Sequence, residues 1–350
     1  MNSLFDYRQE LDALQFTEAQ KSALARQAVE AAGKASAPRR RRTALRSGLM
    51  AACLMLALAV GAGASGVLKT VVESFSGIFG GGKAQTEIID SIGRPIGACD
   101  TDNGVTITAD AIMGDRYNAA VVFTIRRDDG TALLPADTDP DSLLMGGFGG
   151  ADLNVLGGLH GGSWFVDEVP GDDAIQMVQV LSADVPLTRC SATAEFEDLC
   201  WFDESVGQPV VLIEGHWKFR FDVNYEDTSV SLGGGETFQQ GGMTFTVDGI
   251  SISPVAVKVD YTVNREVQWS DSGSGQQSEH DRRQLERYME NVEILLTTKD
   301  GTVLDLSNSG GSIKPENGMT KCSKSLVFEE IIPLEEISSL SVGGIVYPMA

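Results

Sequence analysis

Histidine is the side chain that most often serves in acid–base catalysis and metal binding near neutral pH, and this chain has three. His160 lies among glycines, His216 lies beside Trp217, and His280 lies in a polar segment. None has a partner at metal-ligand spacing, and the motifs H-E-x-x-H, G-x-S-x-G and G-K-[ST] are absent from the sequence. We therefore expect no catalytic, cofactor-binding or metal site, and a protein that is not an enzyme.

Three aspartates, Asp137, Asp139 and Asp141, have the 1-3-5 spacing of a calcium-binding loop. Position six of that loop is Ser142 instead of glycine, and position twelve is Phe148 instead of a bidentate glutamate. Paired carboxylates elsewhere are too numerous to single out a catalytic pair. A solvated acidic surface explains these residues better than a site.

Four cysteines follow Cys53, which itself lies in an apolar segment: Cys99, Cys190, Cys200 and Cys322. No C-x-x-C motif occurs, so the zinc and thioredoxin-like interpretations lack their signature. In an oxidising environment four cysteines allow three pairings. Cys190 and Cys200 could bridge neighbouring strands, which leaves Cys99 with Cys322; four free thiols are the alternative.

The apolar segment, residues 47–68, has 22 positions without a charge. As a helix it would be about 33 Å long, enough to cross a hydrocarbon core of about 30 Å. It follows five arginines: Arg39, Arg40, Arg41, Arg42 and Arg46. Because basic residues stay on the cytoplasmic side, we expect a single-pass transmembrane helix in the lipid bilayer of the cell membrane. The amino terminus would be cytoplasmic and the carboxyl-terminal part extracytoplasmic.

Other interpretations of this segment remain. A buried helix of a soluble protein rarely runs so long without a charge. A cleaved signal peptide would use Ala62-Gly63-Ala64, but 46 residues precede the segment, more than a secretory signal carries. Small residues spaced by four could form a helix-dimer face, and the arginines could bind lipid or protein besides setting topology.

Residues 1–46 predict a cytosolic helix pair followed by a basic linker. A capping box at Thr17–Gln20 begins the second helix, and Gly33 suits its end. Apolar residues recur at three and four positions on the first helix, and so short a pair cannot bury them alone. We expect them to contact a partner, the membrane surface or a second copy. The candidate partner-binding residues are Leu4, Tyr7, Leu11, Leu14 and Phe16.

The charge is divided unevenly along the chain. Residues 1–68 hold nine Lys and Arg against five Asp and Glu, a net of +4. Residues 69–350 hold eighteen against forty-four, a net of −26. Such an acidic excess argues against nucleic acid or anionic lipid as partners of the outer part, and it suits a soluble surface domain.

Beyond the apolar segment the pattern has the period of strands. Alternation predicts strands at 105–109, 118–125 and 209–225, and in the last of these Trp217, Phe219 and Phe221 share one face. Turn signals at eight to twelve residues are typical of β-sandwiches. We expect a mainly β protein with two tandem Ig-like β-sandwich domains, residues 69–228 and 229–350.

Three shorter segments complete this prediction. Gly241-Gly242 predicts a hairpin turn. The glycine-rich residues 145–162 and the polar residues 270–287 predict exposed loops.

Several segments resemble known families. Leu11–Lys21 is similar to the opening of single-pass membrane proteins of Gram-positive bacteria. Gly104–Asp110, Asn118–Phe123 and Gly215–Phe221 resemble the DUF4179 family, and Phe245–Pro254 resembles the DUF5643 type of β-domain. The resemblance covers most of the chain. It implies a membrane-anchored surface protein, and relatives are suspected of being anti-sigma factors for extracytoplasmic-function sigma factors. Unlike zinc-containing anti-sigma factors, residues 1–46 contain neither His nor Cys.

These observations favour a membrane-anchored extracytoplasmic sensor in signal transduction. Its outer domains would bind an unidentified ligand, and its inner helix pair would bind a cytosolic partner, with a sigma factor as the candidate. The alternative is a surface structural or adhesive module that has no cytosolic partner.

Overall fold

The computed structural model describes residues 70–136, 138–140, 142–143, 148–149, 159–187, 190–203, 208–270 and 277–349. All of them belong to one compact unit of the chain. The predicted cytosolic helix pair, arginine run and membrane helix lie outside the described residues. Within the described ranges, no helix combines the length and apolar character that a membrane crossing needs.

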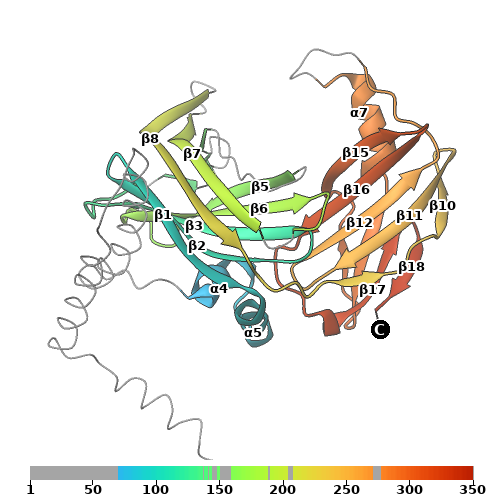
Figure 1. The fold of residues 1–350 in the computed structure, drawn as a ribbon, viewed down its shortest axis with the longest axis horizontal. Coiled ribbons are helices and arrows are strands. Elements are labelled where there is room, and N and C mark those ends of the chain that lie inside the picture. Colours follow the sequence, from blue (N-terminus) through green and yellow to red (C-terminus); the bar gives the residue numbers. More distant parts are fainter. Residues whose placement is uncertain are drawn as a thin grey trace, which may run out of the picture. The chain divides into compact units, whose positions relative to one another are not determined.

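The described chain is mainly β, which confirms the predicted class, and its strands form four antiparallel sheets (Figure 1). The first sheet has the order β1-β2-β3-β6-β5, with β1 Arg94–Asp102, β2 Val105–Gly114, β3 Asn118–Arg127, β5 Leu159–Val166 and β6 Ala174–Ala183. The second sheet has the order β4-β7-β8, with β4 Phe148–Gly149, β7 Cys190–Asp203 and β8 Gln208–Val223.

The other two sheets come from the carboxyl-terminal part. The third sheet has the order β10-β11-β12-β16-β15, and β9 also pairs with β11; the strands are β9 Val230–Leu232, β10 Thr237–Gln240, β11 Met243–Ile252, β12 Ala256–Val263, β15 Gly310–Glu316 and β16 Met319–Val327. The fourth sheet has the order β14-β13-β17-β18, with β13 Ile294–Thr298, β14 Val303–Asp305, β17 Ile337–Val342 and β18 Ile345–Pro348. A 3-10 turn, η2 (Leu334–Glu336), precedes β17.

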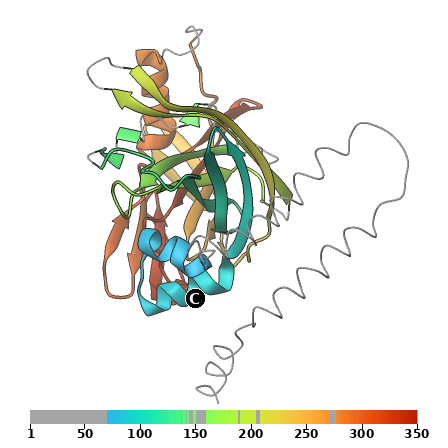
Figure 2. The ribbon, with the colours of Figure 1, turned by 90° about the vertical axis from the view of Figure 1, so that its left-hand side faces the viewer.

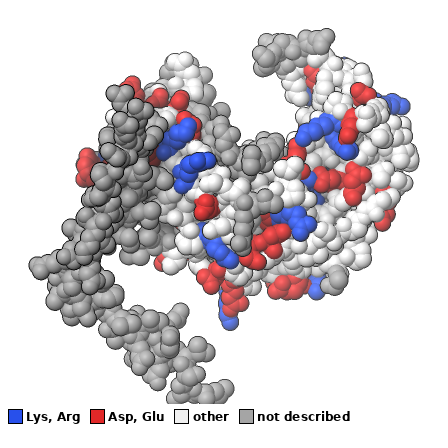
Figure 3. Space-filling model, in the orientation of Figure 1, with Lys and Arg blue, Asp and Glu red and all other residues white. Residues whose placement is uncertain are grey.

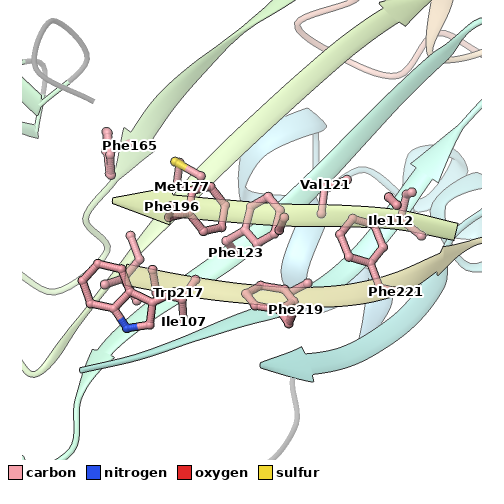
Figure 4. Close-up of a cluster of buried hydrophobic side chains, with 14 of the residues drawn as sticks. Ile107, Ile112, Val121, Phe123, Phe165, Met177, Phe196, Trp217, Phe219 and Phe221 are labelled. Atoms are coloured by element: carbon pink, nitrogen blue, oxygen red, sulfur yellow. The ribbon is translucent and has the colours of Figure 1, made fainter. Parts of the chain in front are cut away.

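The first and second sheets contribute to one core of aromatic side chains. Trp217, Phe219 and Phe221 are all buried on β8, as their alternation predicts. Their rings lie around Phe123 and Phe196, whose centroids are 5.2 Å apart in an edge-to-face arrangement (Figure 4). Each such ring stabilises the fold by about 1.5–3 kcal/mol through burial. Trp217 also donates its indole N–H to the carbonyl of Val105 at 2.8 Å, which satisfies the one polar atom of its side chain.

The third and fourth sheets share a second core. Phe238 and Phe245 stack there with centroids 4.9 Å apart, and Tyr261 is fully buried beside them. Gly241 and Gly242 join β10 to β11 with φ values of 55° and 72°, which confirms the predicted hairpin. Positive φ at both central positions is the geometry that glycine adopts without strain.

The loop predicted over residues 270–287 is wrong in its second half. That half forms α7 (Glu279–Leu285), which continues into a π-helical turn, η1 (Glu286–Glu290). Ser278 caps α7 by accepting a hydrogen bond from the backbone N–H of Asp281 at 3.0 Å. Tyr288 and Met289 are buried, so this polar helix is held by apolar residues at its far end.

The glycine-rich loop predicted over residues 145–162 is also wrong in part, because residues 159–162 belong to β5 and pair with β6. A ladder uses backbone groups, so glycines do not prevent it. At Gly161 a Cβ would lie 2.0 Å from the carbonyl oxygen of Val180. Glycine is therefore required there by the close approach of two strands.

Candidate functional site

Two helices that the strand pattern did not predict cover the outer face of the first sheet. They are α4 (Val71–Phe79) and α5 (Lys83–Ile92), which lie side by side below the strands in Figure 2. Their buried side chains pack on small and apolar residues of β2, β3 and β6. The cluster, called here the helix patch, comprises Phe75, Phe79, Ile89, Ile92, Ala111, Met113, Ala120, Val122, Val178, Val255, Ala256 and Ile331.

The spacing of apolar residues explains why these helices dock. Phe75 and Phe79 are four residues apart on α4, and Ile89 and Ile92 are three apart on α5, so each pair lies on one helix face. The ring centroid of Phe79 is 5.9 Å from that of Phe75 and 6.3 Å from that of Trp164. All four helix residues are at most 2% exposed.

A capping box begins α4. The Oγ1 of Thr70 accepts a hydrogen bond from the N–H of Glu73 at 3.2 Å, and the carboxylate of Glu73 accepts one from the N–H of Thr70 at 2.6 Å. This reciprocal pair satisfies backbone donors that a helix start otherwise exposes. The T-x-x-E pattern at residues 70–73 is the sequence signal that would have located the helix.

The helix patch also reaches residues of the carboxyl-terminal part of the chain. The N–H of Ile331 donates to the carbonyl of Phe79 at 2.9 Å, and the side-chain amide of Gln85 donates to the carbonyl of Ile331 at 3.3 Å. The N–H of Glu226 donates to the carbonyl of Ile92 at 3.0 Å. The helix pair is thus fixed to the first sheet, to the segment around Glu226 and to the segment after β16.

The chain has two parts: the amino-terminal part with the first and second sheets, and the carboxyl-terminal part with the third and fourth sheets. A second contact between these two parts is polar and buried. The turn between β2 and β3 holds Asp115, which is 1% exposed. Its Oδ1 accepts hydrogen bonds from the N–H of Tyr117 at 2.8 Å, and from the N–H and side-chain amide of Asn118 at 2.8 and 2.9 Å. Its Oδ2 accepts one from the hydroxyl of Ser253 at 2.7 Å. Burial raises the pKa of Asp115, and the hydrogen bonds from Ser253, Tyr117 and Asn118 oppose that rise.

Asn118 extends this contact. Its side-chain carbonyl accepts hydrogen bonds from the hydroxyls of Ser182 and Ser325, both at 2.6 Å. Tyr225 donates its hydroxyl to the carbonyl of Asp115 at 2.9 Å, and burial raises the pKa of Tyr225 above its usual range. The turn residues 115–118 with Ser182, Ser253 and Ser325 are called here the polar junction.

Charged groups flank the polar junction. The ammonium of Lys258 lies 4.5 Å from the centroid of the Tyr117 ring and pairs with Asp260. Asp184, after β6, accepts hydrogen bonds from Ser312 at 2.8 Å and from Lys314 at 2.5 Å, both on β15. These contacts add links between the two parts of the chain.

The histidines lie apart from these contacts. His216 is half exposed, with its Nε2 3.0 Å from Glu195, and the Nε2 of His280 is 2.7 Å from the carbonyl of Gln268. Lys218 and His216 hold the pKa of Glu195 below its usual range. In the part of the chain that the structure describes, no three His, Cys, Asp or Glu side chains gather as metal ligands. Asp137 and Asp141 lie outside that part.

The cysteines require a correction. Cys190 and Cys200 do not lie on neighbouring strands, because both are on β7. Ten residues of strand separate their Cα atoms by about 30 Å, whereas a disulfide needs about 4.4–6.8 Å, so that pairing is wrong. Cys190, Cys200 and Cys322 are thiols in the structure. Burial raises the pKa of the Cys322 thiol to about 12, far from reactive.

Surface charge offers no single-sign patch on the face drawn in Figure 3, where acidic and basic side chains alternate with uncharged areas. The candidate partner-binding residues Leu4, Tyr7, Leu11, Leu14 and Phe16, and the arginines 39–42 and 46, lie outside the described residues. The helix patch and the polar junction are the two features of the structure that the sequence pattern did not predict.

No family model matches the chain, and no curated protein matches it. Among solved structures, a conserved domain protein from Bacillus anthracis is similar with a TM-score of 0.45 and 16% sequence identity. The match covers 71% of this chain and 76% of that one.

Proposed function

We propose that this protein is a membrane-anchored extracytoplasmic sensor that signals across the membrane. Residues 47–68 would span the bilayer, and residues 1–46 would lie in the cytoplasm. Residues 69–228 and 229–350 would be tandem β-sandwich domains outside, of the DUF4179 and DUF5643 types. The sharing of one core by the first and second sheets and of another by the third and fourth supports this organisation.

The observation that carries the proposal is the position of the helix patch. α4 begins at Val71, three residues after Leu68, the last residue of the proposed span. Its far end is hydrogen-bonded to Ile331 and its rings are buried. A flexible linker of ten residues has an end-to-end distance of about 17 Å and would absorb movement. A helix that is capped and packed against the sheet cannot absorb movement in this way. A displacement of the β-sheets would therefore be transmitted to residues 47–68, the proposed span.

The cytosolic end would hold the partner. The apolar residues of the first predicted helix need a surface to cover them, and a sigma factor is the partner that the family resemblance suggests. The outer part would bind a ligand that remains to be identified. A protein with only an adhesive role has no need of a docked helix next to the membrane.

The test compares two strains. One expresses the tagged full chain, and the other expresses in its place a tagged chain that lacks residues 2–34. We expect a sigma factor to be recovered with the full chain and lost with the deletion, and the transcripts that depend on it to change between the two strains. A matched pair sharpens the result: Leu11→Glu, on the apolar face, should act like the deletion, whereas Gln9→Glu, on the opposite face, should not.

If no cytosolic protein is recovered and the transcripts are the same in all strains, the signalling proposal fails. The surface structural or adhesive module is then the function that remains.

A further inference from the structure

The outer face of the fourth sheet carries almost no charge. The side chains of a strand alternate between its two faces, and on β13, β14, β17 and β18 one set points into the second core. The pairing of these strands places the other set in two rows across the sheet. This outer set, called here the fourth-sheet face, comprises Leu295, Thr297, Val303, Asp305, Ser339, Ser341, Val346 and Pro348.

The fourth-sheet face is open to solvent. None of its eight residues is buried, and Val303 and Val346, on the two edge strands, are 55% and 62% exposed. Its one charged residue, Asp305, lies on an edge strand, where its Oδ1 accepts a hydrogen bond from the backbone N–H of Ser307 at 2.9 Å. The face is therefore neutral across the two central strands and apolar at both edges.

The outer face of the second sheet has a different composition. The same alternation gives eight outward positions on β7 and β8. Five of them are charged: Glu195, Glu197, Lys218, Arg220 and Asp222. Charged residues are depleted where a protein surface is covered by a partner. The fourth-sheet face, with one charge in eight positions, has the composition of a contact surface.

The charge of the chain indicates what covers this face. Residues 69–350 have a net charge of −26, so a basic partner would gain more from the acidic remainder of the surface. Two copies of the chain repel each other over that remainder, and the fourth-sheet face is a place where they can meet with little repulsion. A two-fold axis parallel to the strands would place β14 of one copy over β18 of the other. The two Asp305 carboxylates would then be at least about 14 Å apart, three strand spacings, which exceeds the screening length of about 8 Å.

We propose that the fourth-sheet face joins two copies of this chain, sheet against sheet. The face covers about 250 Å² on each copy, well below the 800 Å² or so per partner of a stable interface. The pair is therefore weak in solution. The inference rests on the proposed function at this point, because anchoring both copies in one membrane raises the local concentration that sustains a weak pair.

The experiment places a photo-crosslinking amino acid in the full chain, in cells that express two differently tagged copies. One strain carries it at Thr297 on the fourth-sheet face, and the matched control carries it at Thr193 on the outer face of β7. Both threonines are half-buried on sheet strands. We expect a product that contains both tags from Thr297, and at least tenfold less of it from Thr193.

A charge on the face tests which molecule occupies it. Ser341→Glu, on a central strand, should lower the yield of the two-tag product about tenfold or more, because like charges then meet. Ser191→Glu, at an exposed position on β7, should leave the yield unchanged. Expressing Ser341→Glu under one tag and Ser341→Lys under the other should restore the product, a result that only contact between two copies gives.

Three results would overturn the pairing: no two-tag product from Thr297, equal yields from Thr297 and Thr193, or a product at Thr297 that contains another protein instead of a second copy. Failure of Ser341→Lys to restore the product would do so as well. Separating the membrane fraction of the same cells tests the anchoring by itself. A chain found outside that fraction would contradict the proposed function, whereas the crosslinking yields decide the pairing.

Discussion

The backbone N–H of Ile331 donates a 2.9 Å hydrogen bond to the carbonyl oxygen of Phe79, which joins the end of α4 to the segment that follows β16. Both side chains are buried in the helix patch, at 2% exposure each. The first helix after the proposed span is therefore fixed by a part of the chain that is distant in sequence. The first prediction tests how much of the fold's stability this docking contributes.

Replacing Phe79 by alanine removes a buried ring that contacts Phe75 and Trp164. We expect the free energy of unfolding to fall by about 3–5 kcal/mol, since a large buried side chain leaves a cavity. Denaturant unfolding of the full chain measures it. Val303→Ala is the control, because Val303 is 55% exposed and its loss should cost less than about 0.5 kcal/mol. Equal losses in the two variants would show that the helix is not held by this packing.

Two glycines allow the stability cost of backbone strain to be measured apart from the cost of steric contact. Gly343 and Gly318 both have positive φ, 56° and 81°. A Cβ on Gly343 would lie 2.5 Å from the ring of Phe238, whereas one on Gly318 would meet nothing within 4 Å. Gly318→Ala should therefore cost about 1–2 kcal/mol from conformation alone, and Gly343→Ala about 1–3 kcal/mol more from overpacking. A Gly343→Ala chain as stable as Gly318→Ala, compared by chemical denaturation, would contradict the packing of the second core.

Because of Lys324, we expect the free energy of unfolding to depend on pH at alkaline values. Its buried ammonium donates to the carbonyls of Met289, Val292 and Ser307, and burial lowers its pKa to about 8 from 10.5. Between those values the unfolded chain binds a proton that the folded chain releases, so stability should rise with pH across that window. Lys324→Met should abolish the rise, and it should lower stability at pH 7 by about 1–3 kcal/mol because carbonyls lose their donor.

The control for that experiment is Lys299→Met, since Lys299 is exposed on a turn. It should keep the wild-type slope of stability against pH. A slope that persists in Lys324→Met would assign the alkaline titration to another group.

The strands follow from the sequence more readily than the helices do. Alternation at Trp217, Phe219 and Phe221 predicts both the strand and its buried face, because the side chains of a strand point to opposite sides in turn. Alternation does not predict β1 in the same way, because most of its residues are half-buried and none of them is fully buried. Neither face of β1 has the apolar pattern of a core strand.

Neither the helix patch nor the polar junction could be predicted from the sequence, and the reasons differ. α4 has only nine residues, too short for its apolar period to stand out from neighbouring glycines and serines. Asp115 and Asn118 look in sequence like ordinary turn residues. Their acceptors matter only because Ser253 and Ser325, far along the chain, lie beside them and donate hydrogen bonds to them. Such a long-range contact has no local signal.

The most direct test of signal transmission inserts ten Gly and Ser residues between Leu68 and Lys69, which gives the proposed span slack before α4. The matched control places the same insertion between Ser272 and Gly273, which are far from the proposed span along the sequence. Transcripts are measured while the medium outside the cell is changed in pH or composition. The account predicts that responses depending on residues 2–34 disappear with the first insertion and persist with the second. Equal responses in both insertion strains would contradict it.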